Sequence, residues 1–385
     1  MLDLFPLTEE QREIERVARN FAATEIVPYS KQWDRDSYFE PTLVKKLGDL
    51  GFLGMLTPEE YDGLGLDTVT YLVALEEIAA ADASVAVMMS VHNSLPTQML
   101  ASFGTEEQKQ RFLKPMARGE LLGAFALSES EAGSDAAALT TQAVREGDGW
   151  ILNGTKSWVT SGPYAGVIVV QARTDTPEDR KGARGIGAFI VTPDLRGVSV
   201  GKKEDKMGLR ASPTVQLILD GVHVPSANLL GDPSMGFVYA MRSLDAGRLG
   251  IAAQALGIAR AAFDAAVAYA AERRQFGQAI KDFQGIQFKL ANMATRISAA
   301  RALLHAAARA KDANASSSKQ AASMAKLFAS EMAMWVTTEA VQIFGGYGYV
   351  KDYPVEKLFR DAKITEIYEG TSEIQRIVIA RELYA

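Results

Sequence analysis

The chain has 385 residues, of which 48% are hydrophobic and 23% charged, with a net charge of -6, a composition typical of a globular protein with a large buried core. It contains no cysteine, which excludes disulfides, zinc–thiolate sites, iron–sulfur clusters and cysteine nucleophiles. Its three histidines lack metal-ligand spacing and its charges form no basic stripe, so neither a metal site nor nucleic-acid binding is expected.

The N-terminus carries no recognisable targeting signal. Residues 1–10 have neither a basic segment nor an apolar core, and no run in the chain approaches the roughly 20 apolar residues of a membrane span. We therefore expect a cytoplasmic protein that does not interact with membranes.

The first part of the chain has helical periodicity. Thr8 and Gln11 fit a capping box, followed by apolar residues at three- and four-residue spacing. The Gly- and Pro-rich residues 51–66 predict a loop. The other predicted helices cover residues 41–50, residues 68–89, which form a buried helix, and a segment that starts at Thr105. These elements predict an N-terminal helical domain over residues 1–122.

From about Gly123 the apolar period changes to two, which is typical of strands. Asn153-Gly154 lies between two strand-like runs and predicts a hairpin turn. Further strands are predicted at residues 167–173, 187–191, 198–202 and 214–219. Short strands separated by Gly, Pro and Asp favour a small antiparallel barrel or sandwich over residues 123–232.

Helical periodicity returns after Gly236. Long Ala-rich helices are predicted at residues 249–273, 283–312 and 319–344, and a last one at 371–382. Long helices with short connections favour an antiparallel bundle, here over residues 233–385. The fold class is therefore α+β and mostly α, with the layout helices, strands, helices.

Two glycine runs resemble nucleotide-binding motifs without fitting them. Gly149–Ser157 places its Lys one residue late for a P-loop and reads as strand rather than as the start of a helix. Gly182–Gly187 precedes a strand and lacks a surrounding βαβ unit, so a Rossmann-type nicotinamide site is not expected.

Three other segments are candidates for a site, and each has a structural alternative. Leu127–Asp135 is rich in hydroxyls and suits phosphate or flavin binding, or is a plain polar loop. Gln342–Gly348 ends a helix with glycines that allow close backbone approach, or simply cap it. Glu369 lies between Tyr368 and Gly370 just before a helix, as a general base or as a solvated acid.

Taken together, the motifs resemble the acyl-CoA dehydrogenase family, and most of all its short-chain and short-branched-chain members. The resemblance runs from about Thr8 to Ala385. It rests on five stretches in the family's order, namely residues 125–135, 201–210, 273–277, 353–357 and 360–376. It implies a helical domain, a β-domain and a C-terminal four-helix bundle, with FAD between the β-domain and the bundle.

The resemblance assigns roles to individual residues. It implies Glu369 as the catalytic base and no metal. The implied FAD contacts are Phe125, Leu127, Ser128, Gly133, Ser134, Trp158, Val159, Thr160, Arg273, Phe276, Gln284, Gln342, Ile343, Gly345, Gly346, Thr371, Ser372 and Glu373. The implied substrate contacts are Ser134, Phe237, Asp245, Arg248, Tyr368 and Gly370. Part of the FAD grip would come from a neighbouring subunit, which implies a homo-oligomer, usually a dimer of dimers.

The resemblance also implies a reaction. Glu369 would remove the α-proton of an acyl-CoA thioester, with its own backbone N–H and a flavin hydroxyl on the thioester carbonyl. The product would be a trans-2-enoyl-CoA, with electrons passed to an electron-transferring flavoprotein. Some subtypes place the base at the position of Gly247, which has no side chain to act as one.

Substrate length is less well defined by the sequence. Met88, Met89 and Leu95 favour a short acyl pocket for straight or methyl-branched chains, as in fatty-acid β-oxidation or branched-chain amino-acid degradation, and they are equally good core residues. A medium-chain enzyme is the main alternative. The end of the chain at Ala385 disfavours an acyl-CoA oxidase, and the net charge of -6 disfavours a DNA-associated relative. The last alternative is a purely structural helical protein, which would not bind FAD.

Overall fold

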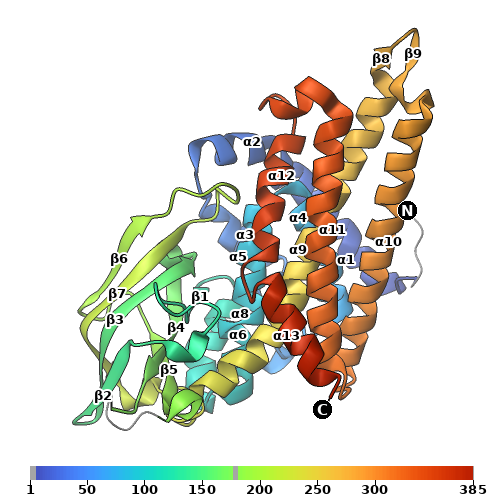
Figure 1. Ribbon diagram of the computed structural model, residues 1–385. Coiled ribbons are helices and arrows are strands. Elements are labelled where there is room, and N and C mark those ends of the chain that lie inside the picture. The colour runs from blue at the N-terminus through green and yellow to red at the C-terminus, as the bar shows by residue number, and fades with distance from the viewer. Residues whose placement is uncertain (1–5, 177–180, 385) are drawn as a thin grey trace.

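The computed structural model describes residues 6–176 and 181–384. It has three parts: N-terminal helices, a β-sheet, and C-terminal helices that stand beside both (Figure 1). This is the predicted layout of helices, then strands, then helices. One hydrophobic core joins the N-terminal helices to the C-terminal ones, and a second core fills the sheet.

The N-terminal part begins as predicted, with Thr8 and Gln11 forming a capping box. Its α-helices are α1 (Glu9–Phe21), α2 (Val27–Asp36), α3 (Thr42–Asp49), α4 (Thr68–Ala81), α5 (Ala83–Ser94), α6 (Pro96–Phe103), α7 (Glu106–Gln108) and α8 (Lys114–Ala117). The prediction of one helix over residues 68–89 is wrong. Asp82 has an extended backbone and caps α5 by accepting hydrogen bonds from the N–H groups of Ser84 and Val85. Because both helices are buried on all sides, the apolar pattern does not reveal the break.

The central sheet has seven strands in the order β1-β4-β2-β3-β7-β6, with β5 paired to β4. The strands are β1 (Leu122–Ala126), β2 (Gln142–Glu146), β3 (Gly149–Thr160), β4 (Ala165–Arg173), β5 (Ile186–Val191), β6 (Val198–Lys203) and β7 (Thr214–Pro225). Most pairs are antiparallel, as predicted, but β1 runs parallel to β4. The sheet is therefore mixed rather than purely antiparallel.

The predicted hairpin at Asn153-Gly154 is wrong. β3 continues through both residues, and the turn lies before it, where Glu146 pairs with Gly149. Gly154 marks an irregularity in the pairing of β3 with β7, and a Cβ there would lie 2.5 Å from Thr141 Oγ1. The glycine is thus required by close packing inside a strand.

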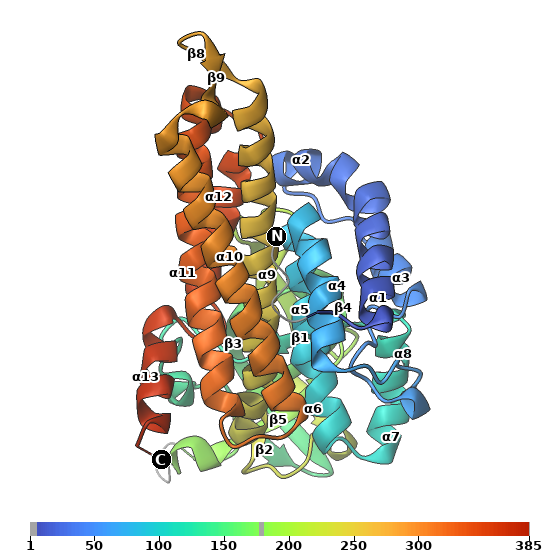
Figure 2. The same ribbon diagram turned by 90° about the vertical axis from the view of Figure 1, so that its right-hand side faces the viewer.

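The C-terminal part contains α9 (Gly236–Glu272), α10 (Gln284–Asp312), α11 (Ser318–Phe344), α12 (Val355–Lys363) and α13 (Ser372–Glu382). Helices α9, α10 and α11 run side by side, and α4 and α5 flank α9 (Figure 2). α9 begins earlier than predicted, and α12 was not predicted. α9 is long and apolar enough to cross a membrane, but 61% of its most apolar window is buried within the protein, which is typical of a core helix.

A short β-hairpin, β8 (Arg274–Gln275) and β9 (Gln278–Ala279), connects α9 to α10. It projects beyond the end of the bundle, far from the sheet (Figures 1 and 2).

Candidate active site

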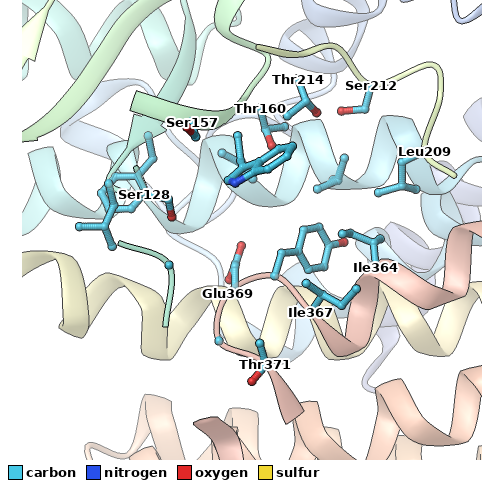
Figure 3. A pocket seen from close by; sticks show the side chains of 18 of the residues that line it. Ser128, Ser157, Thr160, Leu209, Ser212, Thr214, Ile364, Ile367, Glu369 and Thr371 are labelled. Atoms are coloured by element: carbon cyan, nitrogen blue, oxygen red, sulfur yellow. The ribbon is translucent and has the colours of Figure 1, made fainter. Parts of the chain in front are cut away.

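A cavity of about 760 Å³ lies between the sheet, helices α5 and α9, and the segment that joins α12 to α13. Figure 3 shows hydroxyl groups from the sheet on one side and Glu369 on the other. The predicted site residues that line it are Phe125, Leu127, Ser128, Gly133, Ser134, Trp158, Thr160, Arg248, Tyr368, Glu369, Gly370 and Thr371. Residues distant in the sequence are thus brought to one cavity.

The Glu369 carboxylate points into this cavity (Figure 3). The residue is partly exposed, but both carboxylate oxygens are buried and have no hydrogen-bond partner among the described residues. Burial raises the pKa of Glu369 from 4.5 to about 7, and the positive charges of Lys326 and Arg248 oppose the shift. A carboxyl group in this state can accept a proton near neutral pH.

Gly247 of α9 faces this carboxylate. A Cβ built at Gly247 would lie 2.0 Å from Glu369 Oε2, closer than any two non-bonded atoms can approach. The helix therefore needs glycine here to leave room for the carboxylate, although glycine in a helix interior is unfavourable by roughly 0.5–1 kcal/mol.

The opposite wall of the cavity comes from the sheet. Trp158 has a left-handed backbone (φ 62°) and is 61% exposed. The hydroxyl-bearing residues Ser128, Ser157 and Thr160 line the same cavity as Trp158, and Figure 3 shows them on the side opposite Glu369. An aromatic face with hydroxyl donors around an apolar space fits a planar, polar-edged group such as a flavin.

A buried ion pair fixes the loop that begins at Leu127. Lys156 is fully buried, and its Nζ donates to Glu129 Oε1 over 2.8 Å and to the Leu127 carbonyl over 3.0 Å. Glu129 also accepts hydrogen bonds from the backbone and hydroxyl groups of Thr140 and Thr141. The pair lowers the pKa of Glu129 to about 2 despite its burial. The Ser-rich loop is thus held in place by a buried network in which Lys156 and Glu129 both have hydrogen-bond partners.

The other predicted residues lie outside the cavity lining. Val159 and Ile343 are buried in hydrophobic cores, and neither lines the cavity. Phe237 packs in a small cluster around Leu127, and Asp245 forms an ion pair with Arg248 at 2.6 Å. Ser372 and Glu373 form the first turn of α13.

A second group lies at the far end of the bundle, next to the β8–β9 hairpin. We call Arg273, Phe276, Gln284, Gln342, Gly345 and Gly346 the far-end cluster. Phe276 is 95% exposed, and a Cβ at Gly345 or Gly346 would meet no atom within 4 Å. A single copy of the chain does not bring this cluster to the cavity.

Two residues that the sequence analysis missed hold the turn formed by Glu369 and Gly370, which we call the Glu369 turn. Lys326 of α11 and Gln375 of α13 are fully buried and donate hydrogen bonds to its carbonyl groups. One signal could have found Lys326: it occupies the apolar face of an Ala-rich helix, where a lysine is rarely placed without a function.

Comparison with known proteins identifies the family to which the chain belongs. Models of the N-terminal, middle and C-terminal domains of acyl-CoA dehydrogenases match residues 8–120, 124–222 and 234–384. The mitochondrial short-chain specific acyl-CoA dehydrogenase of Mus musculus is 50% identical over 377 residues, covering 98% of this chain and 90% of that protein.

Solved structures give the same result. Butyryl-CoA dehydrogenase from Megasphaera elsdenii superposes with a TM-score of 0.96 at 44% identity and covers 100% of both chains. A chain solved in work on the electron transferring flavoprotein of Acidaminococcus fermentans has a TM-score of 0.96 at 48% identity, covering 99% of both. The three domain models and these identities place the chain in the acyl-CoA dehydrogenase family, and it is a flavin-dependent oxidoreductase.

Proposed function

We propose that the protein dehydrogenates short-chain acyl-CoA thioesters between the α and β carbons, with FAD as cofactor and an electron-transferring flavoprotein as electron acceptor. The observation that carries the proposal is the Glu369 carboxylate, which is buried, directed into the cavity and without a hydrogen-bond partner in the part of the chain that the structure describes. It lies across the cavity from the hydroxyl-lined wall that fits a flavin (Figure 3).

Glu369 is proposed as the base that takes the α-proton. Its pKa of about 7 makes it a stronger base than an ordinary carboxylate, and still largely ionised just above neutral pH. The Glu369 backbone N–H would donate to the thioester carbonyl and stabilise the enolate charge as it forms. Because Gly247 has no side chain, the Glu369 carboxylate can occupy the space beside α9. When bound, the flavin supplies the acceptor for the β-hydrogen and its electron pair.

The proposed FAD contacts fall into two groups. Ser128, Thr160 and Trp158 would hold the flavin ring at the cavity wall. The far-end cluster would hold the other end of an FAD molecule bound mainly by a second copy of the chain, which requires at least a dimer and favours a dimer of dimers.

A short acyl group is supported by the apolar cavity lining. Val87 and Val91 of α5, and Leu95 directly after it, contribute to it. Met88 and Met89, which the sequence analysis also considered, are buried in the hydrophobic core instead and do not line the cavity. Relatives named for short-chain and butyryl substrates support the same preference. The A. fermentans chain supports the electron-transferring flavoprotein as partner.

The test is an anaerobic titration of the yellow protein with acyl-CoAs of graded length and branching, following flavin absorbance. Short acyl-CoAs are expected to bleach it fastest. In Glu369→Gln, FAD should stay bound while the rate of bleaching falls at least about a thousandfold, as for a removed general base.

The matched control is Glu366→Gln, which removes an acid from the same segment. Glu366 pairs with Lys363 at 2.6 Å and, unlike Glu369, does not line the cavity, so loss of this partly exposed pair should leave the rate within about twofold. Normal bleaching in Glu369→Gln would overturn the proposal.

A further inference from the structure

The turn that carries Glu369 is held by two buried side chains from different helices. Lys326 Nζ donates to the Gly370 carbonyl over 2.8 Å. Gln375 Nε2 donates to the same carbonyl over 2.9 Å and to the Glu369 carbonyl over 3.2 Å. Neither residue lines the cavity. Both carbonyls of the turn are therefore bound from the side of the helices, away from where substrate would lie.

The backbone of this turn needs such support. Glu369 has a φ of 51° and Gly370 a φ of 91°. Both values are positive, a backbone conformation that residues other than glycine rarely adopt. A non-glycine residue persists in this conformation only where its surroundings enforce it. A Cβ at Gly370 would lie 2.7 Å from Gln375 Nε2, so the position of the donor and the glycine fit each other.

Lys326 also places a charge beside the base. It has no carboxylate partner at ion-pair distance among the described residues. Burial lowers the pKa of Lys326 to about 8, and the charge of Glu369 is the largest opposing influence. Arg248 of α9 is the other cation that acts on Glu369. Burial raises the pKa values of the Tyr71 and Tyr368 phenols, and the charge of Glu369 adds to both shifts.

A buried lysine with one hydrogen bond is a poor device for stability alone, because removing its charge from water is costly. Lys326 acts on Glu369 in two ways. Its hydrogen bond to the Gly370 carbonyl affects the conformation of the turn, and its positive charge acts on the Glu369 carboxylate.

We propose that Lys326 is a positioning residue for the catalytic base: its ammonium group fixes the Glu369–Gly370 turn by binding the Gly370 carbonyl, and Gln375 fixes the same turn with a neutral donor. This inference rests on the proposed function, in which Glu369 removes the α-proton.

The first experiment uses Lys326→Met in the FAD-loaded protein, because methionine keeps the length of the side chain and removes its donors and charge. The value of kcat is expected to fall about 10- to 100-fold, as for a misplaced base, with KM changed less than about twofold. The acid limb of the kcat/KM profile should move to higher pH by at least about half a unit, because loss of a nearby positive charge disfavours the carboxylate.

Gln375→Leu separates the two influences. It removes a neutral donor from the same turn, so kcat should fall while the acid limb keeps its position. Lys326→Gln retains an N–H donor and is expected to recover part of kcat but not the position of the limb. Ser330→Ala is the matched control on α11: Ser330 is buried and donates only to backbone carbonyls of its own helix, so neither quantity should change.

A wild-type kcat and an unmoved acid limb in Lys326→Met would overturn the inference. So would a loss of rate that disappears once FAD content is matched. If Lys326→Met does not fold, the kcat/KM–pH profile of Lys326→Gln is the test. An acid limb at the wild-type pH in that variant overturns the inference. Failure of the wild-type protein to react with any acyl-CoA would instead overturn the proposed function, so the two failures are distinguishable.

Discussion

The interdomain cavity and the far-end cluster both contain predicted site residues, but they differ in completeness. In the cavity, the sheet, α9 and the Glu369 turn face one another within one chain. At the far end, Phe276 is 95% exposed and Gly345 and Gly346 have open space around them. The proposed apparatus for proton removal is thus assembled by folding of one chain, whereas the far end is open to a further molecule.

This difference has a physical origin. A base must be desolvated to have a raised pKa, and desolvation requires an enclosed site. A phosphate- or adenosine-binding surface works through exposed donors and backbone amides and needs no enclosure before its ligand arrives. The two regions therefore respond differently to substitution, which the following predictions use.

Apart from the loss of Glu369 itself, the largest effect is expected at Gly247, where the cavity has no spare space. In Gly247→Ala the new methyl group would displace the Glu369 carboxylate, since the Cβ would lie 2.0 Å from Oε2. A base displaced by about 1 Å should lose roughly a hundredfold in kcat, measured by anaerobic flavin reduction with a short acyl-CoA.

Gly250→Ala is the matched control, one turn further along α9. Its Cβ would crowd Ser90 Oγ at 2.3 Å rather than Glu369. It should lower stability without a comparable loss of rate. Equal losses of kcat in both variants would contradict the specific role of Gly247.

A smaller effect, on cofactor affinity rather than catalysis, is expected at the far end. Arg273 lies over the ring of Tyr347, 5.5 Å from its centroid, and is proposed to bind the FAD of a second copy. Arg273→Met should weaken FAD binding about 10- to 100-fold, because a hydrogen bond to a charged group is worth about 1.5–3 kcal/mol. The release of flavin on dilution measures this.

The neighbouring Arg274, which donates to the Gly277 carbonyl over 3.2 Å, provides the control. Arg274→Met should leave FAD affinity nearly unchanged. If a monomer retains FAD as tightly as the oligomer does, the idea that the far-end cluster acts across subunits is wrong.

Much of the fold could be predicted from periodicity. The capping box at Thr8 and the bounds of α10 and α11 agree with the prediction to within a residue. The errors occur where the local sequence is compatible with two different secondary structures. Asp82 interrupts a run that is apolar on every side, and Asn153-Gly154 is a turn signal placed inside a strand, where tertiary contacts decide.

The site divides in the same way. Sequence motifs point to Glu369 as a candidate base, but nothing near it in the sequence indicates that its oxygens are buried. The space at Gly247, the charge of Lys326 and the donor of Gln375 reach Glu369 only through the fold. Residues that act through a long-range contact are thus the ones that sequence reasoning misses.

The last effect concerns stability rather than rate or cofactor affinity, and it tests whether enclosure has a cost. Because the folded-state pKa of Glu369 is raised to about 7, its protonated form stabilises the fold below about pH 4.5, and this contribution is lost as pH rises toward 7. Glu369→Gln keeps a neutral group at every pH. It should therefore gain stability over the wild type as pH rises from about 4.5 to 7, by on the order of 3 kcal/mol at most, with no further gain above that range.

The measurement is thermal unfolding of both proteins across this pH range at matched flavin content. Arg273→Met serves as the comparison, because Arg273 is partly exposed and arginine side chains do not titrate in proteins. Its difference from the wild type should not depend on pH. A Glu369→Gln difference that is equally flat would mean that the carboxylate is solvated in the folded protein. In that case the contrast between an enclosed cavity and an open far end would no longer hold.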